Sequence, residues 1–292
     1  MPTTWLAALF VGVVALVIAL RHYRQGQADT LLDDHARRRT SGEAERHLSE
    51  WREAHRRLRD GDVEGLRTLE RIGQEKTRLR QDIVTSICAG LRGGLELGVD
   101  EEWRRTLQDA LVRHLRPGSE FWAGMSLQFE SATLVDFDVS GCRIRTAKFA
   151  RAEFLGTTTF DAMTVTGDAA FDEARFGRRV SFDDALFARS TSFRATRFTG
   201  NASFDGMRVT EEATFSHARF SGRTTFARAE FGDVAHFRRT RFGGRAYFTG
   251  AVFGKATTFD HTWFRGRTDV NDALFGDDAS FEGTLFGRRV PR

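Results

Sequence analysis

Two histidines and one aspartate pair have residue types and a spacing that could support metal binding. His217 and His261 each stand two residues after a phenylalanine, and Arg239 lies midway between them in the chain. Asp136-Phe137-Asp138 has the D-x-D spacing of a metal-binding pair. Whether either set can hold an ion depends on how the intervening chain folds.

Other catalytic and cofactor signals are missing from the sequence. Cys88 and Cys142 have neither metal-ligand spacing nor a disulfide framework, and both lie in apolar patterns. We therefore expect two reduced, buried thiols in a reducing compartment. The sequence contains no phosphate-binding glycine loop, nucleophile elbow or zincin signature. It predicts no catalytic residues, no cofactor and no metal, and hence a protein that is not an enzyme.

Arginine supplies nearly all of the positive charge, since Lys76, Lys148 and Lys255 are the only lysines. The totals of 44 basic and 40 acidic residues are nearly balanced, which argues against a uniformly basic nucleic-acid binder or a uniformly acidic DNA mimic. Two sets of arginines recur at one constant interval, the second interrupted only by Asn201. They are Arg175, Arg197, Arg219 and Arg241, and Arg179, Arg223, Arg245, Arg267 and Arg289.

The same interval governs the apolar residues and predicts the fold. Buried-type residues recur every five residues from Phe129 to Phe154, and then at alternating steps of five and six as far as Phe286. The pattern therefore repeats after about 11 residues and again after about 22 residues, periods that indicate a coiled solenoid rather than an α-helix or an alternating strand. Many of the residues two positions before each centre are small, as at Ala132, Cys142 and Ala147.

This combination resembles the pentapeptide-repeat family over about residues 125–290. The resemblance implies a right-handed quadrilateral β-helix, mainly β, with four repeats per coil and one on each side. The sequence departs from the family pattern by a sixth residue in every second repeat after Phe154. We expect two opposite corners of each coil to be wider, with glycines accommodating them at 177, 200, 222, 232, 244, 254, 266 and 276.

The predicted solenoid argues against metal binding by either candidate set. His217 and His261 would lie two coils, or roughly 10 Å, apart, which is too far to share one ion. In the same register Phe137 points inward and both neighbouring carboxylates point outward, which favours a solvated face over a metal site.

Charge is distributed unequally over the four sides of the predicted coil. From 161 to 291, two adjacent sides sum to −8 and the other two to +10. Both arginine sets fall on the basic half and would form columns with members about 4.8 Å apart. Like charges at that spacing repel, so the columns favour counter-ions or a partner. The alternative is a solvated arginine ladder tolerated through screening.

The N-terminal region predicts a membrane anchor. Residues 5–20 form an uncharged apolar run. Thr3 and Thr4 extend it to roughly 18 residues, long enough for one bilayer crossing. A cleaved signal peptide is the competing interpretation, but no basic residue precedes the run. Arginines follow it, which predicts a single-pass plasma-membrane protein with its N-terminus outside and its solenoid in the cytoplasm. The predicted domains are 1–24 (anchor and basic flank), 25–118 (α-helical) and 119–292 (β-helix).

Residues 25–118 show apolar stripes at helical spacing, broken at Asp60-Gly61-Asp62, at Gly73 with the polar run to Thr77, and at Gly93-Gly94. Asp62 is suited to cap the second helix. Breaks at such short intervals predict a small packed bundle, the alternative being a long coiled stalk. Together with the anchor and repeats, segments such as 65–72 resemble membrane-anchored pentapeptide-repeat proteins of actinobacteria.

Two function classes follow. The first is a non-enzymatic, membrane-tethered scaffold whose arginine columns bind an acidic partner protein or an anionic phospholipid surface. The second is a nucleic-acid-related protein that uses the same arginines. Some pentapeptide-repeat proteins mimic duplex DNA and protect gyrase, which requires an acidic surface. Residues 121–292 carry a net charge of +3, so the resemblance does not transfer that role.

Overall fold

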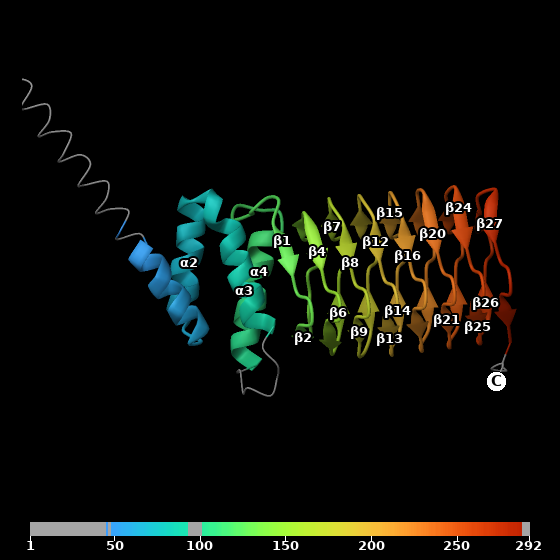
Figure 1. The fold of residues 1–292 in the computed structure, drawn as a ribbon, viewed down its shortest axis with the longest axis horizontal. Helices are drawn as coiled ribbons and strands as arrows, with labels where there is room; N and C mark the ends of the chain where they lie inside the picture. Colours follow the sequence, from blue (N-terminus) through green and yellow to red (C-terminus); the bar gives the residue numbers. More distant parts are fainter. Residues whose placement is uncertain (1–44, 46–47, 93–100, 288–292) are drawn as a thin grey trace, which may run out of the picture.

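The structure is a computed structural model of the 292-residue chain and describes residues 45, 48–92 and 101–287. A small helical sector is stacked on one end of a long β-solenoid (Figure 1). The predicted anchor at 1–24 lies outside the described residues. Within the described ranges, no helix combines the length and the apolar character that a bilayer crossing requires.

The helical sector is a packed bundle, as the breaks in the pattern predict. Residues 48–59 are helical and are followed by α2 (Val63–Glu75), η1 (Thr77–Leu79), α3 (Arg80–Arg92) and α4 (Glu101–Leu115). The Asp62 carboxylate caps α2 by accepting a hydrogen bond from the Glu64 N–H. The predicted break between Gly73 and Thr77 is confirmed, since α2 ends at Glu75 and η1 begins at Thr77, but Gly73 itself is still helical. It lies inside α2, where a Cβ atom would meet the Trp122 ring at 2.5 Å.

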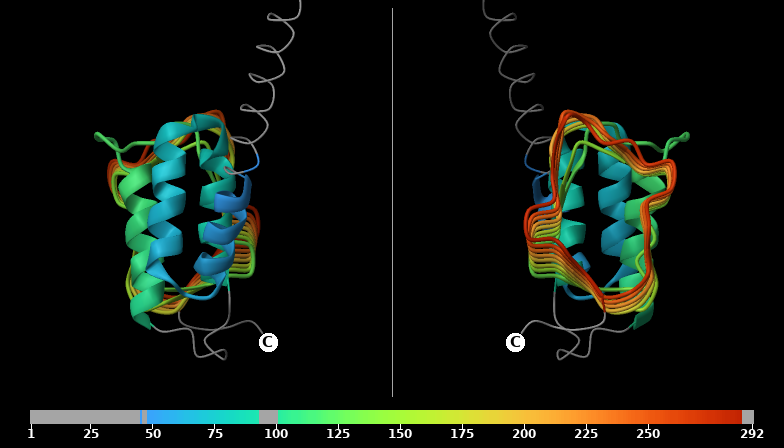
Figure 2. Two further views of the ribbon diagram at one scale, coloured as in Figure 1. Left: turned by 90° about the vertical axis from the view of Figure 1, so that its left-hand side faces the viewer. Right: turned by 90° about the vertical axis from the view of Figure 1, so that its right-hand side faces the viewer.

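The solenoid has about seven turns, and its strands form four parallel sheets, here named A to D in chain order around each coil (Figures 1 and 2). Sheet A contains β1 (Ser126–Gln128), β4 (Thr146–Lys148), β8 (Ala169–Ala170), β12 (Thr191–Ser192), β16 (Ala213–Thr214), β20 (Val234–His236), β24 (Ala256–Thr258) and β27 (Asp278–Ser280). Sheet B contains β2 (Thr133–Val135), β5 (Glu153–Leu155), β9 (Arg175–Phe176), β13 (Arg197–Phe198), β17 (Arg219–Phe220), β21 (Arg241–Phe242), β25 (Trp263–Phe264) and β28 (Leu285–Phe286).

The other two sheets have six strands each. Sheet C contains β6 (Thr158–Thr159), β10 (Val180–Ser181), β14 (Ala202–Ser203), β18 (Thr224–Thr225), β22 (Ala246–Tyr247) and β26 (Thr268–Asp269). Sheet D contains β3 (Arg143–Ile144), β7 (Thr164–Val165), β11 (Leu186–Phe187), β15 (Arg208–Val209), β19 (Glu230–Phe231) and β23 (Val252–Phe253). Seen down the long axis, the coils overlie one another (Figure 2).

The register of the strands confirms the predicted period. In the first coil Ser126 pairs with Thr146, 20 residues later in the chain. In later coils Ala147 pairs with Ala169 and Phe198 with Phe220, each 22 residues later. Strict five-residue repeats thus build the first coil, and the added sixth residues lengthen the later ones. The mainly β solenoid that the repeats predict is therefore confirmed.

Stacked phenylalanine rings fill the interior. Phe220 is 1% exposed and stacks on Phe198 at 4.5 Å and on Phe242 at 4.9 Å between ring centroids, with planes within 5° of parallel. Neighbouring ladders meet edge to face, as Phe204 and Phe215 do at 5.5 Å. Both geometries are favoured for aromatic pairs because they align ring edges with ring faces. The phenylalanines therefore form the hydrophobic core of the solenoid, as their inward-facing pattern predicts.

The corners differ from the prediction in where the backbone is strained. The wide corners B–C and D–A do carry glycines, but close stacking of the coils is the reason. A Cβ atom at Gly244 would lie 2.2 Å from the Gly222 carbonyl oxygen. Most left-handed residues of the solenoid lie at the narrow corners and are not glycine, as His217 (φ 63°) and Arg239 (φ 55°) show; Asp136 and Gly156, at the B–C corner of the first coils, are exceptions. His217 and Arg239 each donate the backbone N–H to a carbonyl of the next coil, which holds the turn.

The helical sector covers the first coil. The Gln81 side chain pairs with both backbone groups of Ser126, donating at 3.0 Å and accepting at 2.8 Å. Arg104, buried in α4, donates to the Thr133 carbonyl at 3.1 Å, and Gln108 donates to the Val135 carbonyl at 3.2 Å. These bonds satisfy a strand edge that would otherwise offer itself to another chain.

The last described coil is open by comparison. Its large apolar side chains are exposed: Val270, Leu274, Phe281, Leu285 and Phe286. Phe286 is 68% exposed, whereas Phe264 directly beneath it is 3% exposed. The phenylalanine ladders are thus covered by the helical sector at one end, whereas the rings of the last described coil are partly exposed to solvent.

Candidate functional site: the arginine columns

Sheet B presents the first arginine column. Its short strands alternate one outward and one inward residue, so in β9, β13, β17 and β21 an exposed arginine precedes each buried phenylalanine. Arg175, Arg197, Arg219 and Arg241 pair in direct register from strand to strand. Their backbones are therefore separated by the strand spacing of about 4.8 Å. We call this set the sheet B column; Glu153 precedes it and Trp263 follows it.

The second column lies at the wide B–C corner and is called the corner column. Its described arginines are all exposed: Arg179, Arg223, Arg245 and Arg267. Arg289, the fifth predicted member, lies outside the described residues. At the gap, the Asn201 side chain accepts a hydrogen bond from the Arg223 N–H at 3.0 Å. The Arg223 guanidinium also lies 4.6 Å from the Tyr247 ring centroid, a cation–π contact that fixes its direction.

The columns have almost no acidic partners within the described residues. Arg175 is bound to Glu153 at 3.3 Å, with both side chains largely exposed. No ion pair is found there for the other members of either column.

Several carboxylates of the solenoid, in contrast, are occupied by hydrogen bonds to the next coil. Asp183 accepts from the Asp205 N–H at 3.0 Å, and Asp205 accepts from the Ala227 N–H at 3.1 Å. These two carboxylates thus hold neighbouring coils together, whereas the arginines of the two columns face solvent.

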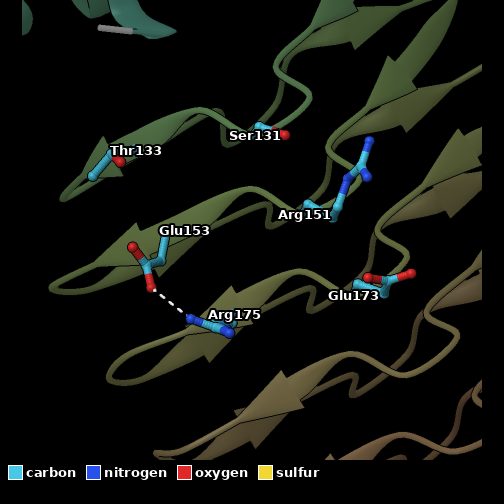
Figure 3. A pocket seen from close by; sticks show the side chains of 6 residues that line it. All are labelled: Ser131, Thr133, Arg151, Glu153, Glu173 and Arg175. Atoms are coloured by element: carbon cyan, nitrogen blue, oxygen red, sulfur yellow. Dashed lines mark hydrogen bonds and ion pairs between the residues drawn. The ribbon is translucent and has the colours of Figure 1, made fainter. Parts of the chain in front are cut away.

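A shallow pocket lies beside the start of the sheet B column (Figure 3). It is lined by Ser131, Thr133, Arg151, Glu153, Glu173 and Arg175. The Glu153–Arg175 ion pair crosses it, and its charges are evenly mixed (Figure 3). This arrangement offers no nucleophile beside a base.

A third group of arginines was not predicted from the sequence. Arg194, Arg238 and Arg239 lie at the narrow A–B corner beside His217, and all four side chains are exposed. The backbone and neighbouring side chains partly desolvate His217, which lowers its pKa below its ordinary value, and the charges of Arg239, Arg194 and Arg238 lower it further. The sequence could have indicated this basic corner, because the segments 194–197, 216–219 and 238–241 contain arginines and no carboxylate.

The candidate metal residues are not brought together. Asp136 accepts from the Thr157 N–H at 2.9 Å and Asp138 from the Ser140 N–H at 2.8 Å, so both carboxylates stabilise turns around the buried Phe137. His217 and His261 lie two coils apart, with Arg239 between them. In the part of the chain that the structure describes, no three potential metal ligands cluster.

The two cysteines are free and buried, as predicted. Burial raises the pKa of each thiol to about 12. Neither thiol is therefore activated as a nucleophile at neutral pH.

Comparison with known proteins identifies the repeats. Residues 149–197, 193–241 and 237–285 each match the family model described as pentapeptide repeats (9 copies). No curated protein and no solved structure matches the chain. The family match covers residues 149–285 of the solenoid and does not extend to its first strands, to the helical sector or to residues 1–24.

Proposed function

We propose that this chain, which belongs to the pentapeptide-repeat family, is a non-catalytic interaction scaffold whose two arginine columns bind an acidic surface of a partner protein. One observation carries the proposal. Eight exposed arginines are stacked coil upon coil, and within the described residues only Arg175 has a carboxylate partner.

Electrostatic repulsion within the columns destabilises the solenoid when no partner is bound. Two unit charges at the coil spacing of about 4.8 Å repel by about 0.9 kcal/mol in water, and by more where solvent is displaced. An acidic surface would remove that repulsion and would form charge-assisted hydrogen bonds with the guanidinium groups. The rigid backbone of the solenoid favours such binding because little conformational entropy is lost.

The limited length of the sheet B column favours a protein over a continuous lipid surface. Glu153 precedes its first arginine, and Trp263 and Leu285 follow its last. A bilayer lying along the whole side would also contact these groups, whereas an acidic protein patch can match four coils. The predicted N-terminal anchor is part of this proposal, since it would hold the scaffold at the cytoplasmic face of a membrane.

Binding of polyglutamate to the full-length protein tests the proposal. Changing Arg223, Arg245 and Arg267 to Ser should weaken binding about ten-fold, and salt should weaken the wild type, because exposed ion pairs are modest and screened. The fold should be retained, since the three side chains are exposed.

The matched control changes the diagonally opposite D–A corner, with Glu211 and Glu212 replaced by Gln and Asp233 by Asn. This variant should bind polyglutamate as well as the wild type. Equal loss in both variants would contradict the proposal. Anionic vesicles or duplex DNA that displace polyglutamate at matched salt and charge concentration would favour the lipid or nucleic-acid alternative.

A further inference from the structure

The narrow A–B corner and the adjoining part of sheet B form a compact basic surface. Three successive coils contribute the segments 194–197, 216–219 and 238–241, which read R-A-T-R, S-H-A-R and R-R-T-R. We call their six arginines the corner patch: Arg194, Arg197, Arg219, Arg238, Arg239 and Arg241. All six are exposed, and none has an ion pair within the described residues.

The backbone of the corner patch is fixed in every coil. Ala195, His217 and Arg239 have left-handed φ angles of 56°, 63° and 55°. Their N–H groups donate at 2.9 Å to Ser216, Arg238 and Asp260 carbonyls respectively. The inward phenylalanines on either side of this corner are buried and stacked, as Phe215 is on Phe237 at 4.9 Å. The positive charges are therefore presented from a rigid support.

His217 lies in the middle coil of the patch. Its partial desolvation lowers its pKa most, and three arginines of the patch, from the coils on either side, lower it further: Arg239, Arg194 and Arg238. The patch is also bounded along the solenoid axis by carboxylates. Asp172 and Glu173 occupy the same corner one coil earlier, and Asp260 occupies it one coil later. A long anionic ligand lying along this corner would meet like charges at both ends.

The spacing of the patch selects the shape of the ligand. Its three coils lie at intervals of about 4.8 Å, so the first and third are about 9.6 Å apart. Carboxylates at positions i, i+3 and i+7 of an α-helix are about 4.5 and 10.5 Å apart along the helix axis. Side chains on one face of an extended peptide are about 6.7 Å apart and fall out of step after one coil.

We propose that the corner patch binds a short acidic α-helix of a partner protein, lying along the solenoid axis. This inference rests on the proposed scaffold function and names the structure that the scaffold recognises. The matched coil and helix spacings let each coil meet one carboxylate. The flanking Asp172 and Asp260 limit the acidic stretch to about two helical turns.

The test uses the full-length protein and two synthetic peptides of equal length, glutamate content and net charge. One is stapled as a helix with glutamates at i, i+3 and i+7, and the other has the same glutamates in a sequence that proline keeps extended. The helical peptide should bind about ten-fold more tightly, since three exposed charge pairs are gained. Equal affinity for the two peptides would overturn the inference.

Two matched arginine variants separate this inference from the proposed function. Changing Arg194, Arg238 and Arg239 to Ser should weaken binding of the helical peptide about ten-fold, whereas the corner-column variant at Arg223, Arg245 and Arg267 should leave it nearly unchanged. If only the corner-column variant weakens both ligands, the inference fails and the scaffold proposal stands. If neither variant weakens polyglutamate or the helix, both fail.

The His217 imidazole provides a readout that a purely structural effect would not produce. Carboxylates bound beside it should raise its pKa, because they offset the positive charges of Arg239, Arg194 and Arg238. NMR titration of His217 with and without the helical peptide measures this change. An unchanged titration midpoint under saturating peptide would place the peptide elsewhere and would overturn the inference.

Discussion

Replacing Phe220 by Ala should be among the most destabilising single changes in the solenoid. The ring is 1% exposed, and its two faces are covered by Phe198 and Phe242, with centroid separations of 4.5 and 4.9 Å. Phe204 and Phe226 meet it edge to face, with centroid separations of 6.2 and 6.1 Å. Backbone hydrogen bonds between the coils fix their spacing, so the cavity cannot collapse. We expect a loss of about 3–5 kcal/mol, the range for truncating a buried phenylalanine.

Phe286 provides a matched control because it belongs to the same ladder of sheet B. It is 68% exposed, and among the described residues its ring stacks on Phe264 alone, at 5.1 Å between ring centroids. Phe286→Ala should therefore cost less than about 1 kcal/mol, since little apolar surface returns to water. Urea unfolding followed by circular dichroism measures both free energies. Similar losses at the two positions would refute the argument that stacking on both faces stabilises the solenoid.

Three further outcomes follow from the described residues. Gly222→Ala should destabilise the solenoid by about 2 kcal/mol or more, because its Cβ would lie 2.5 Å from a carbonyl oxygen of the preceding coil, whereas Gly250→Asn should cost less than about 1 kcal/mol in thermal unfolding. The Cys88 thiol, whose pKa burial raises to about 12, should resist iodoacetamide at pH 8 until denaturant is added; rapid labelling of the native protein would contradict its burial. The pKa of His217 should be lower in the folded protein than in the unfolded chain, so folding favours its neutral form. Its contribution to stability is therefore present above its ordinary pKa and is lost as the pH falls towards the lowered pKa. Arg239→Ser should raise the midpoint of its NMR titration, and no movement would show that the two groups do not interact.

The repeat pattern was enough to predict the solenoid, its period and the direction of its side chains. Burial must repeat each time the chain returns to the same side, so spacing alone predicted both the inward ladder of Phe198 and Phe220 and the outward position of Arg197 and Arg219. The lengthening of each coil after the first turn could be read in the same way, from the added sixth residues. These properties are local and periodic, which is why a single sequence carries them.

The reason for the corner glycines and the capping of the first coil became clear from the tertiary structure alone. Glycines could be placed at the wide corners, but the reason that Gly244 is required there is the carbonyl oxygen of the coil before it. The bonds from Gln81 and Arg104 to the first coil join residues without any repeat between them. Such contacts depend on how two surfaces fit in space, and no periodic signal in the sequence encodes that fit.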